Sequence, residues 1–126
     1  MKKIVNTTKA PAAIGPYSQG TVHNGTLYVS GQLPINPESG EMVTGDIKAE
    51  TTMVLKNLEA IVTEAGGKLE NILKATILLT DMGDFAAVNE VYGGFFPSEP
   101  PARICYQVCG LPKGARVEID AICALQ

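Results

Sequence analysis

The fold of this chain is decided near its C-terminus, by the segments PPARICYQVC (residues 100–109), GLPKG (110–114) and RVEIDAICA (116–124). The first and third segments alternate apolar and polar side chains, which is typical of β-strands with one buried face. Glycine and proline in the middle segment favour a turn. We therefore predict two strands that pair directly with each other as a β-hairpin.

Alternation assigns the side chains of this predicted hairpin to two faces. An apolar face is expected to hold Ile104, Tyr106, Val108, Val117, Ile119, Ala121 and Cys123. The opposite face is expected to hold Arg103, Cys105, Gln107, Cys109, Glu118, Asp120 and Ile122. A shift of one residue would bury the charged side chains, so the pattern favours this register. The hairpin would then bring a guanidinium, thiols and carboxylates together.

Length and composition limit the possible architectures and partners. With 126 residues, of which 45% are hydrophobic, the chain is predicted to form a single domain over residues 1–126. The net charge is −3 and no basic cluster occurs, so we expect no nucleic-acid partner. No long apolar run follows the N-terminal lysines, so we expect no signal peptide, no membrane partner and a cytoplasmic location.

The cysteine and histidine content addresses disulfides and metals. The chain has three cysteines, Cys105, Cys109 and Cys123. An odd number in a chain without a secretion signal predicts free thiols. His23 is the only histidine, and neither a CxxC nor an HExxH motif occurs. The sequence therefore predicts no metal site.

The rest of the chain adds strands and two helices to the prediction. Further strands are predicted over residues 2–6, 20–23, 27–33 and 72–80. Asn24-Gly25 is a strong signal for a hairpin turn between two of them. Apolar residues at three- and four-residue spacing predict amphipathic helices over residues 47–65 and 85–96, the first capped by Asp46.

The order of these elements indicates a two-layer α+β domain with a mixed sheet of about six strands. Right-handed crossovers place both helices on the same face of that sheet. The other face would present the polar side of the hairpin together with Tyr28, Ser30, Gln32, Thr76 and Leu78. This face is too polar for a closed core and too apolar for solvent. We therefore expect it to pack against other copies of the chain, with a ligand site at the junction.

Arg103 is the leading candidate for ligand binding. It stands at the start of a predicted strand, separated by one residue from the rigid Pro100-Pro101 step, and a planar guanidinium held there suits bidentate capture of a carboxylate. An ion pair with Glu118 or Asp120 across the hairpin would explain the same residue without a ligand. The sequence leaves both explanations open.

Other candidate site residues also have a functional and a structural explanation. Cys105 has no nearby base, so we expect an inert thiol whose backbone N–H is available to a ligand. Glu118 is suited to orient water or act as a general base, or to form an ion pair. Asn89 interrupts an apolar helix stripe and needs a polar partner, from a loop or a ligand. Tyr17 follows Gly15-Pro16, either as a fixed pocket aromatic or as a loop filler.

Seven blocks spread along the chain resemble one protein family. They are AIGPYSQ (13–19), VSGQ (29–32), TDM (80–82), VNEVY (88–92), PARxC (101–105), LPK (111–113) and VEIDA (117–121). By these blocks the chain is similar to the reactive-intermediate deaminase family, also called Rid or YjgF, over nearly its whole length. It departs from the family at Ile104, Tyr106 and Gln107, where members often carry Ser, Val and Glu.

The resemblance implies a homotrimer with a chorismate-mutase-like α+β fold and sites in the clefts between subunits. It implies cofactor-free hydrolysis of 2-imino acids, such as 2-iminobutanoate and 2-iminopropanoate, and of their enamine tautomers to 2-keto acids and ammonia. Arg103 and the backbone N–H of Cys105 would bind the substrate carboxylate, and Glu118 would hold the attacking water. Pocket-lining roles are implied for Tyr17, Ser30, Gly31 and Asn89. A non-enzymatic, metabolite-binding or regulatory, chaperone-like trimer is the alternative.

Overall fold

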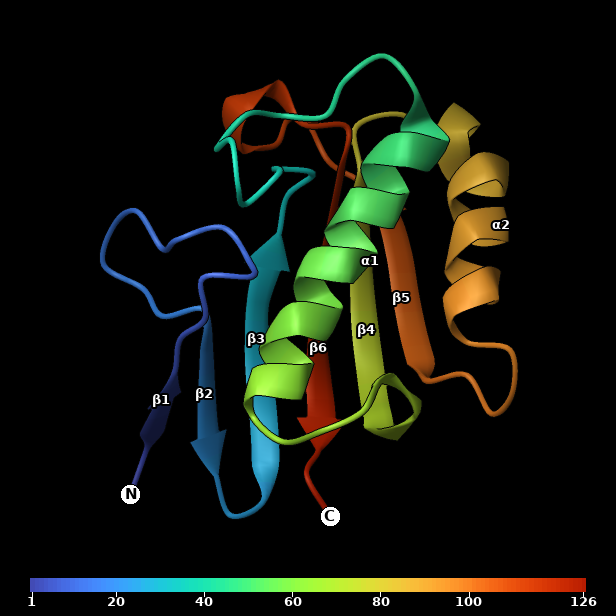
Figure 1. The fold of residues 1–126 in the computed structure, drawn as a ribbon. Helices are drawn as coiled ribbons and strands as arrows, with labels where there is room; N and C mark the ends of the chain where they lie inside the picture. The colour runs from blue at the N-terminus through green and yellow to red at the C-terminus, as the bar shows by residue number, and fades with distance from the viewer.

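The computed structural model describes residues 1–126 as one six-stranded sheet with two α-helices (Figure 1). The strands are β1 (Lys3–Val5), β2 (Gly20–His23), β3 (Thr26–Gln32), β4 (Ile72–Leu79), β5 (Ala102–Gln107) and β6 (Val117–Ala124). The helices are α1 (Ile47–Glu64) and α2 (Phe85–Phe95), with 3-10 turns at Leu69–Asn71, Met82–Asp84 and Pro112–Gly114. The two helices pack side by side on one face of the sheet, which confirms the predicted two-layer α+β architecture.

The strand order is β1-β2-β3-β6-β4-β5, with β4 and β5 parallel and all other neighbours antiparallel. The predicted hairpin is therefore wrong, because β4 lies between β5 and β6. The connection over residues 108–116 is long enough to step across one strand, a distance of about 10 Å. Two backbone hydrogen bonds fix it to the end of β4, from Val108 N–H to Leu79 O at 2.8 Å and from Thr80 N–H to Arg116 O at 3.2 Å.

The side-chain assignment of β5 is also wrong by one residue. Arg103 pairs with Ala75 of β4, which is buried under the helices. Because residues paired across neighbouring strands share a face, Arg103 and Cys105 lie on the helix-covered face. Ile104 and Tyr106, which were expected in the core, lie on the open face with 44% and 50% of their surface exposed. Since β5 is an edge strand, both of its faces are partly exposed, and alternation alone did not identify the buried one.

The face assignment of β6 is confirmed. Its buried residues are Val117, Ile119, Ala121 and Cys123. Glu118 and Asp120 alternate with them and lie on the open face of the sheet. Together with the corrected assignment of β5, this places Arg103 and Glu118 on opposite faces.

A continuous apolar core between the helices and the sheet holds the two layers together. Its largest fully buried apolar side chains include Leu27, Leu55, Leu58, Ile61, Ile77, Leu79 and Ile119. As predicted, α1 is capped by Asp46, whose carboxylate accepts a hydrogen bond from the Lys48 N–H at 3.0 Å. The chain leaves this helix through Gly66 at a φ of +89°, a conformation that favours glycine. Neither helix has the length and apolar character that a membrane span requires.

The face of the sheet opposite the helices is uncovered in the single chain. Tyr28 is 48% exposed there, and the partly exposed side chains of Ile104 and Tyr106 lie on the same face. Leu78 and Ile122 are half-buried beside them. Large apolar side chains left exposed on an uncovered sheet face are typical of a surface that associates with another protein.

Candidate active site

Arg103 projects from the edge strand β5 toward α2. Its Nη1 donates a hydrogen bond to Asn89 Oδ1 at 2.6 Å. The guanidinium Cζ also lies over the rings of Phe85 and Tyr92. No carboxylate lies within 4.0 Å of the guanidinium. The predicted alternative of an ion pair with a carboxylate of β6 is therefore wrong, because both of those carboxylates lie on the other face of the sheet.

The other arginine of the chain, Arg116, has its charge neutralised. Arg116 Nη2 donates to Glu50 Oε2 at 2.6 Å, and its Nε lies 3.2 Å from the same oxygen. Asp84 adds a second carboxylate, 4.0 Å from Nη1. Of the two arginines, only Arg103 keeps its charge and most of its donors open to a ligand.

Cys105 shares the helix-covered face with Arg103 and is half-buried against the core. Burial raises the pKa of its thiol, and the nearby charge of Arg103 opposes this shift. Because the thiolate is the nucleophilic form, a raised pKa disfavours a nucleophilic role for Cys105. Cys105, Cys109 and Cys123 are all free, as predicted.

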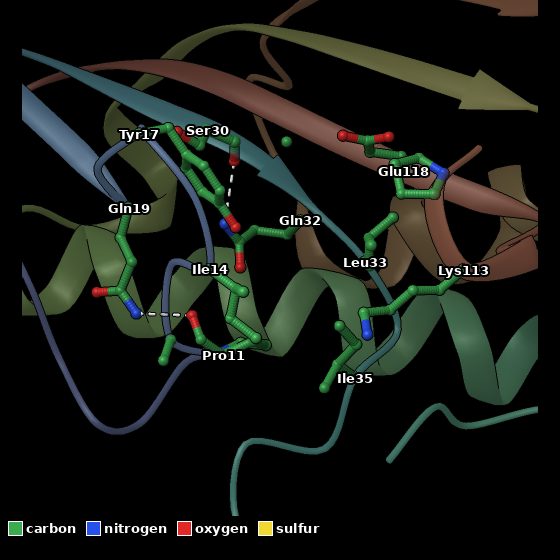
Figure 2. A pocket seen from close by; sticks show the side chains of 13 residues that line it. Pro11, Ile14, Tyr17, Gln19, Ser30, Gln32, Leu33, Ile35, Lys113 and Glu118 are labelled. Carbon is green, nitrogen blue, oxygen red and sulfur yellow. Dashed lines mark hydrogen bonds between the residues drawn. The ribbon is translucent and has the colours of Figure 1, made fainter. Parts of the chain in front are cut away.

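A cavity of about 540 Å³ opens where β3 and β6 meet three loops, at residues 6–18, 33–46 and 108–116 (Figure 2). Four residues that the sequence singled out line it: Tyr17, Ser30, Gly31 and Glu118. The rest of its wall is mainly apolar and includes Pro11, Ala12, Ile14, Leu33, Ile35 and Pro112. Arg103, Asn89 and Cys105 are not among its lining residues.

A β-bulge in β3 shapes this cavity. The pairing of β3 with β6 shifts between Val29 and Gln32, so Ser30 and Gly31 together oppose a single residue of β6. The extra residue turns Gln32 inward, and only 5% of its surface remains exposed. The prediction that Gln32 lies on the open face is therefore wrong, because simple alternation does not reveal an inserted residue.

The carboxylate of Glu118 lies directly against the backbone of Gly31. A Cβ atom at position 31 would come within 2.0 Å of Glu118 Oε2, so only glycine accommodates this position of the carboxylate. Burial, and to a smaller degree the negative charge of Asp120, raises the pKa of Glu118. A raised pKa makes an ionised carboxylate a better proton acceptor than an ordinary glutamate, which suits a general base.

Ser30 ties the loop that carries Tyr17 to the sheet. The Ser30 hydroxyl donates to the carbonyl of Ser18 at 2.5 Å, and the Ser30 N–H donates to the carbonyl of Gln19 at 2.9 Å. The hydroxyl is thus engaged with the protein itself. Tyr17, 54% exposed, is left with its ring beside the cavity (Figure 2).

Sequence reasoning missed two residues of this region, Gln19 and Lys113. The buried amide of Gln19 holds residues 6–18 in place, since its Oε1 accepts from Thr7 N–H at 2.7 Å and its Nε2 donates to Pro11 O at 2.8 Å. Lys113 extends into the cavity from the Pro112–Gly114 turn, with a φ of +58° that is uncommon outside glycine. Both belong to blocks that carry the family resemblance, which was the available signal.

The candidate site residues therefore form two groups within one chain. We call Arg103, Asn89 and Cys105 the guanidinium cluster, and the residues Tyr17, Ser30, Gly31 and Glu118 with their surroundings the carboxylate cavity. The guanidinium cluster lies on the helix-covered face at the sheet edge, and Glu118 lies on the open face. No group of three or more His, Cys, Asp or Glu side chains is arranged to hold a metal ion.

Comparison with known sequences identifies relatives along the whole chain. The family model described as Endoribonuclease L-PSP matches residues 7–125. A protein of Mus musculus named 2-iminobutanoate/2-iminopropanoate deaminase is 50% identical over 122 residues, which are 97% of this chain and 90% of that protein. A protein of Sinorhizobium fredii, also 50% identical, covers 96% of both chains and is named only as a RutC family protein.

Solved structures agree with the sequence comparison. A putative endoribonuclease of Thermotoga maritima is 46% identical and superimposes with a TM-score of 0.98, covering 100% of this chain and 99% of that one. E. coli TdcF with bound serine is 42% identical with a TM-score of 0.93, covering 97% and 98%. A Yersinia pestis protein described as a member of the Rid family is 45% identical with a TM-score of 0.96, covering 98% and 99%. The chain belongs to the Rid (YjgF) family.

Proposed function

We propose that this chain is a hydrolytic deaminase that converts 2-imino acids and their enamine tautomers to 2-keto acids and ammonia. The proposed substrates are 2-iminobutanoate and 2-iminopropanoate, after the relatives about 50% identical to it that carry those names. The observation that carries the proposal is the guanidinium of Arg103, which is held in place but has no carboxylate partner in its own chain. Such a group suits the carboxylate that every 2-imino acid carries.

The proposed site is completed by a neighbouring copy in a homotrimer. Arg103 and Glu118 lie on opposite faces and on strands separated by β4, a lateral distance of about 10 Å, which is too far for one small substrate to contact both. Association through this uncovered face would bring the guanidinium cluster of one copy to the carboxylate cavity of the next. The exposure of Tyr28, Ile104 and Tyr106 supports this assembly.

In the proposed reaction, Arg103 and the backbone N–H of Cys105 bind the substrate carboxylate, which sets the imine carbon beside a water molecule held by Glu118. As the water oxygen bonds to the protonated imine carbon, its proton passes to the Glu118 carboxylate. Glu118 returns the proton to the nitrogen of the resulting carbinolamine. Ammonia then leaves as the carbon–oxygen double bond forms, and the hydroxyl proton passes to solvent. The proposed pocket lining is Tyr17, Ser30, Gly31 and Asn89.

This reaction requires only substrate and water. A protonated imine carbon is electrophilic, so a strong base is not needed and positioning supplies most of the acceleration. Orientation of two reactants contributes up to about 7–11 kcal/mol to lowering a barrier. We also propose a cytoplasmic location, which the three free cysteines favour.

A second candidate function is ligand binding without turnover, as a metabolite-binding, regulatory or chaperone-like trimer. The observation that favours it is the bound serine described for E. coli TdcF, because serine is an amino acid rather than an imine. The same guanidinium and cavity would accept the carboxylate of such a ligand.

A coupled assay separates the two functions. Threonine dehydratase and threonine generate the imine, and release of 2-oxobutanoate is followed with and without this protein. We expect the protein to accelerate release, Arg103→Ala to remove the acceleration, and Lys56→Ala to retain it, since Lys56 is an exposed cation on the outer side of α1. Saturable binding of 2-oxobutanoate or serine without acceleration would support the binding function instead.

A further inference from the structure

One face of α2 is presented to the guanidinium of Arg103. Phe85, Asn89 and Tyr92 follow one another at spacings of four and three residues, so they lie on the same side of the helix. Asn89 Oδ1 accepts the hydrogen bond from Arg103 Nη1. The ring centroids of Phe85 and Tyr92 lie 5.6 Å and 5.0 Å from the guanidinium Cζ. Both distances are within the range in which an aromatic face attracts a cation.

We propose that Phe85 and Tyr92 are positioning residues, which hold the Arg103 guanidinium in the orientation that receives the substrate carboxylate. This inference rests on the proposed function. An aromatic face attracts the cation without using its N–H donors and without neutralising its charge. A carboxylate at the same place would order the side chain but would also occupy the binding group, as Glu50 does for Arg116.

The remaining donors of Arg103 fit this role. A guanidinium has five N–H donors, and the only side-chain hydrogen bond of Arg103 is the one from Nη1 to Asn89. The donors on Nη2 and Nε are therefore left for a ligand. Two parallel donors on one planar group are what bidentate capture of a carboxylate requires.

The ring of Tyr92, and not its hydroxyl, is the part that the proposal uses. Tyr92 is 4% exposed, and its hydroxyl has no hydrogen-bond partner. Its ring packs at 4.6 Å between centroids against Phe96 and lies beside Arg103. Tyr92→Phe therefore keeps the ring and removes only an unsatisfied hydroxyl, whereas Tyr92→Leu removes the ring. These two variants are a matched pair.

The first test measures the order of the guanidinium directly. The chain has only two arginines, so an NMR spectrum of arginine Nε–Hε groups contains two signals, and Arg116, fixed by Glu50, is the internal reference. We expect the Arg103 order parameter to be near that of Arg116 in the wild type and in Tyr92→Phe. It should fall clearly below the reference in Tyr92→Leu and Phe85→Leu. An unchanged value in both leucine variants overturns the proposal.

The second test measures ligand binding. We expect Tyr92→Leu and Phe85→Leu to raise KM for the imino acid and Kd for 2-oxobutanoate about three- to tenfold, with kcat within about twofold of wild type. Tyr92→Phe should match the wild type in all three. A folded leucine variant with a lower Tm but wild-type KM and Kd has lost only core packing, and that result overturns the proposal. If Tyr92→Leu does not fold, Phe85→Leu decides the test, because Phe85 is only half-buried.

The wild-type protein separates this inference from the proposed function. If it neither accelerates imine hydrolysis nor binds 2-oxobutanoate, the proposed function fails and the inference fails with it. If the wild type is active and both leucine variants match it in KM, Kd and arginine order, only the positioning role of the two rings is overturned.

Discussion

Arg116 and Glu50 form a two-pronged ion pair between the start of β6 and the first turn of α1, with Nη2 at 2.6 Å from Oε2 and Nε at 3.3 Å from Oε1. Glu50 is 2% exposed, and the side chain of Arg116 is 40% exposed. The pair fixes the end of the 108–116 connection, two residues before Glu118. The ion pair therefore links the packing of α1 on the sheet to the position of Glu118, the candidate general base.

Glu50→Ala should lower the free energy of unfolding by about 2–4 kcal/mol, because it leaves a guanidinium without its buried partner and opens space under α1. Urea denaturation followed by circular dichroism measures the change. The matched control is Lys48→Ala, which breaks the exposed ion pair between Lys48 and Glu90 and should cost clearly less, because an exposed ion pair contributes little to stability. Equal losses in the two variants would contradict the structural role assigned to the Glu50–Arg116 pair.

Gly31→Ala should remove activity without removing the fold. The backbone of Gly31 does not have a positive φ, so alanine is compatible with it, but the new methyl group would displace the Glu118 carboxylate. Since that carboxylate ends a flexible side chain, it can rotate away at little cost in stability. We expect kcat/KM to fall about 100-fold, the loss expected when a general base is misplaced, with Tm within a few degrees of wild type.

Gly110→Ala is the control for this substitution. Gly110 also lacks a positive φ, and a Cβ atom there would meet nothing within 4 Å. It should retain wild-type kcat/KM. Wild-type activity in Gly31→Ala would show that the observed placement of Glu118 is not the one that the reaction uses.

The pH dependence of stability should reveal the raised pKa of Glu118. Its pKa lies above the ordinary value of 4.5 in the folded protein, so the folded state binds this proton more tightly than the unfolded state does. Wild-type stability is therefore lost relative to Glu118→Gln as the pH rises from about 4.5 through the raised pKa. We expect Glu118→Gln to be the more stable protein at pH 7, to match the wild type below pH 4, and to be inactive. Paired thermal melts across this range measure the difference.

Asp120→Asn tests the second cause of the same shift. Removal of its negative charge should lower the pKa of Glu118 and move the acidic limb of the kcat/KM profile to lower pH. The amide oxygen of asparagine can still accept the hydrogen bond that Thr76 N–H donates to Asp120 at 3.1 Å, so the strand pairing should survive. A shift of the limb to higher pH would contradict the assignment of Glu118 as the group that must be ionised.

Asn89→Asp should fill the binding site with an internal carboxylate. Asn89 Oδ1 already lies 2.6 Å from Arg103 Nη1, so an aspartate in the same position would form an ion pair with the guanidinium. We expect KM to rise at least about tenfold, from the competition of this charge with the substrate carboxylate, and Tm to be unchanged or higher. Asn71→Asp, at an exposed position before β4, adds the same charge elsewhere and should leave KM unchanged.

The sequence was sufficient for features that depend on local periodicity. The apolar spacing over 47–65 predicted α1 to within one residue, and Asn24-Gly25 identified the turn between β2 and β3. The alternation in β6 predicted its faces, because both neighbours of that strand belong to the sheet. In each case one short segment contains the whole signal.

Features that depend on distant segments were not predictable in this way. Local sequence does not distinguish a direct β5–β6 hairpin from an arrangement in which β4 lies between these two strands. The long 108–116 connection permits either arrangement. The reversed faces of β5 follow from its pairing with β4. The bulge at Ser30 and Gly31 follows from one inserted residue. Asn89 was correctly expected to need a polar partner, but Arg103 became that partner only because β5 lies under α2.

A mixing experiment tests whether Arg103 and Glu118 of different copies build one active site. In the proposed homotrimer, the Arg103→Ala and Glu118→Gln variants are each expected to be inactive alone. The two variants are unfolded, mixed in equal amounts and refolded. In any cyclic trimer with both kinds of subunit, one of three interfaces joins the intact Arg103 of one copy to the intact Glu118 of the next. Three quarters of randomly assembled trimers are mixed, so about one quarter of wild-type activity should return.

Two controls are needed to interpret any recovered activity. The double variant carrying both substitutions in one chain, mixed with the wild type in equal amounts, gives the activity expected when subunits exchange freely. Sedimentation confirms that the mixed species are trimers. If exchange occurs and no activity returns from the two single variants, each site must lie within one chain. The opposite faces of Arg103 and Glu118 would then have to be reconciled by a rearrangement of β5, and the shared site would be wrong.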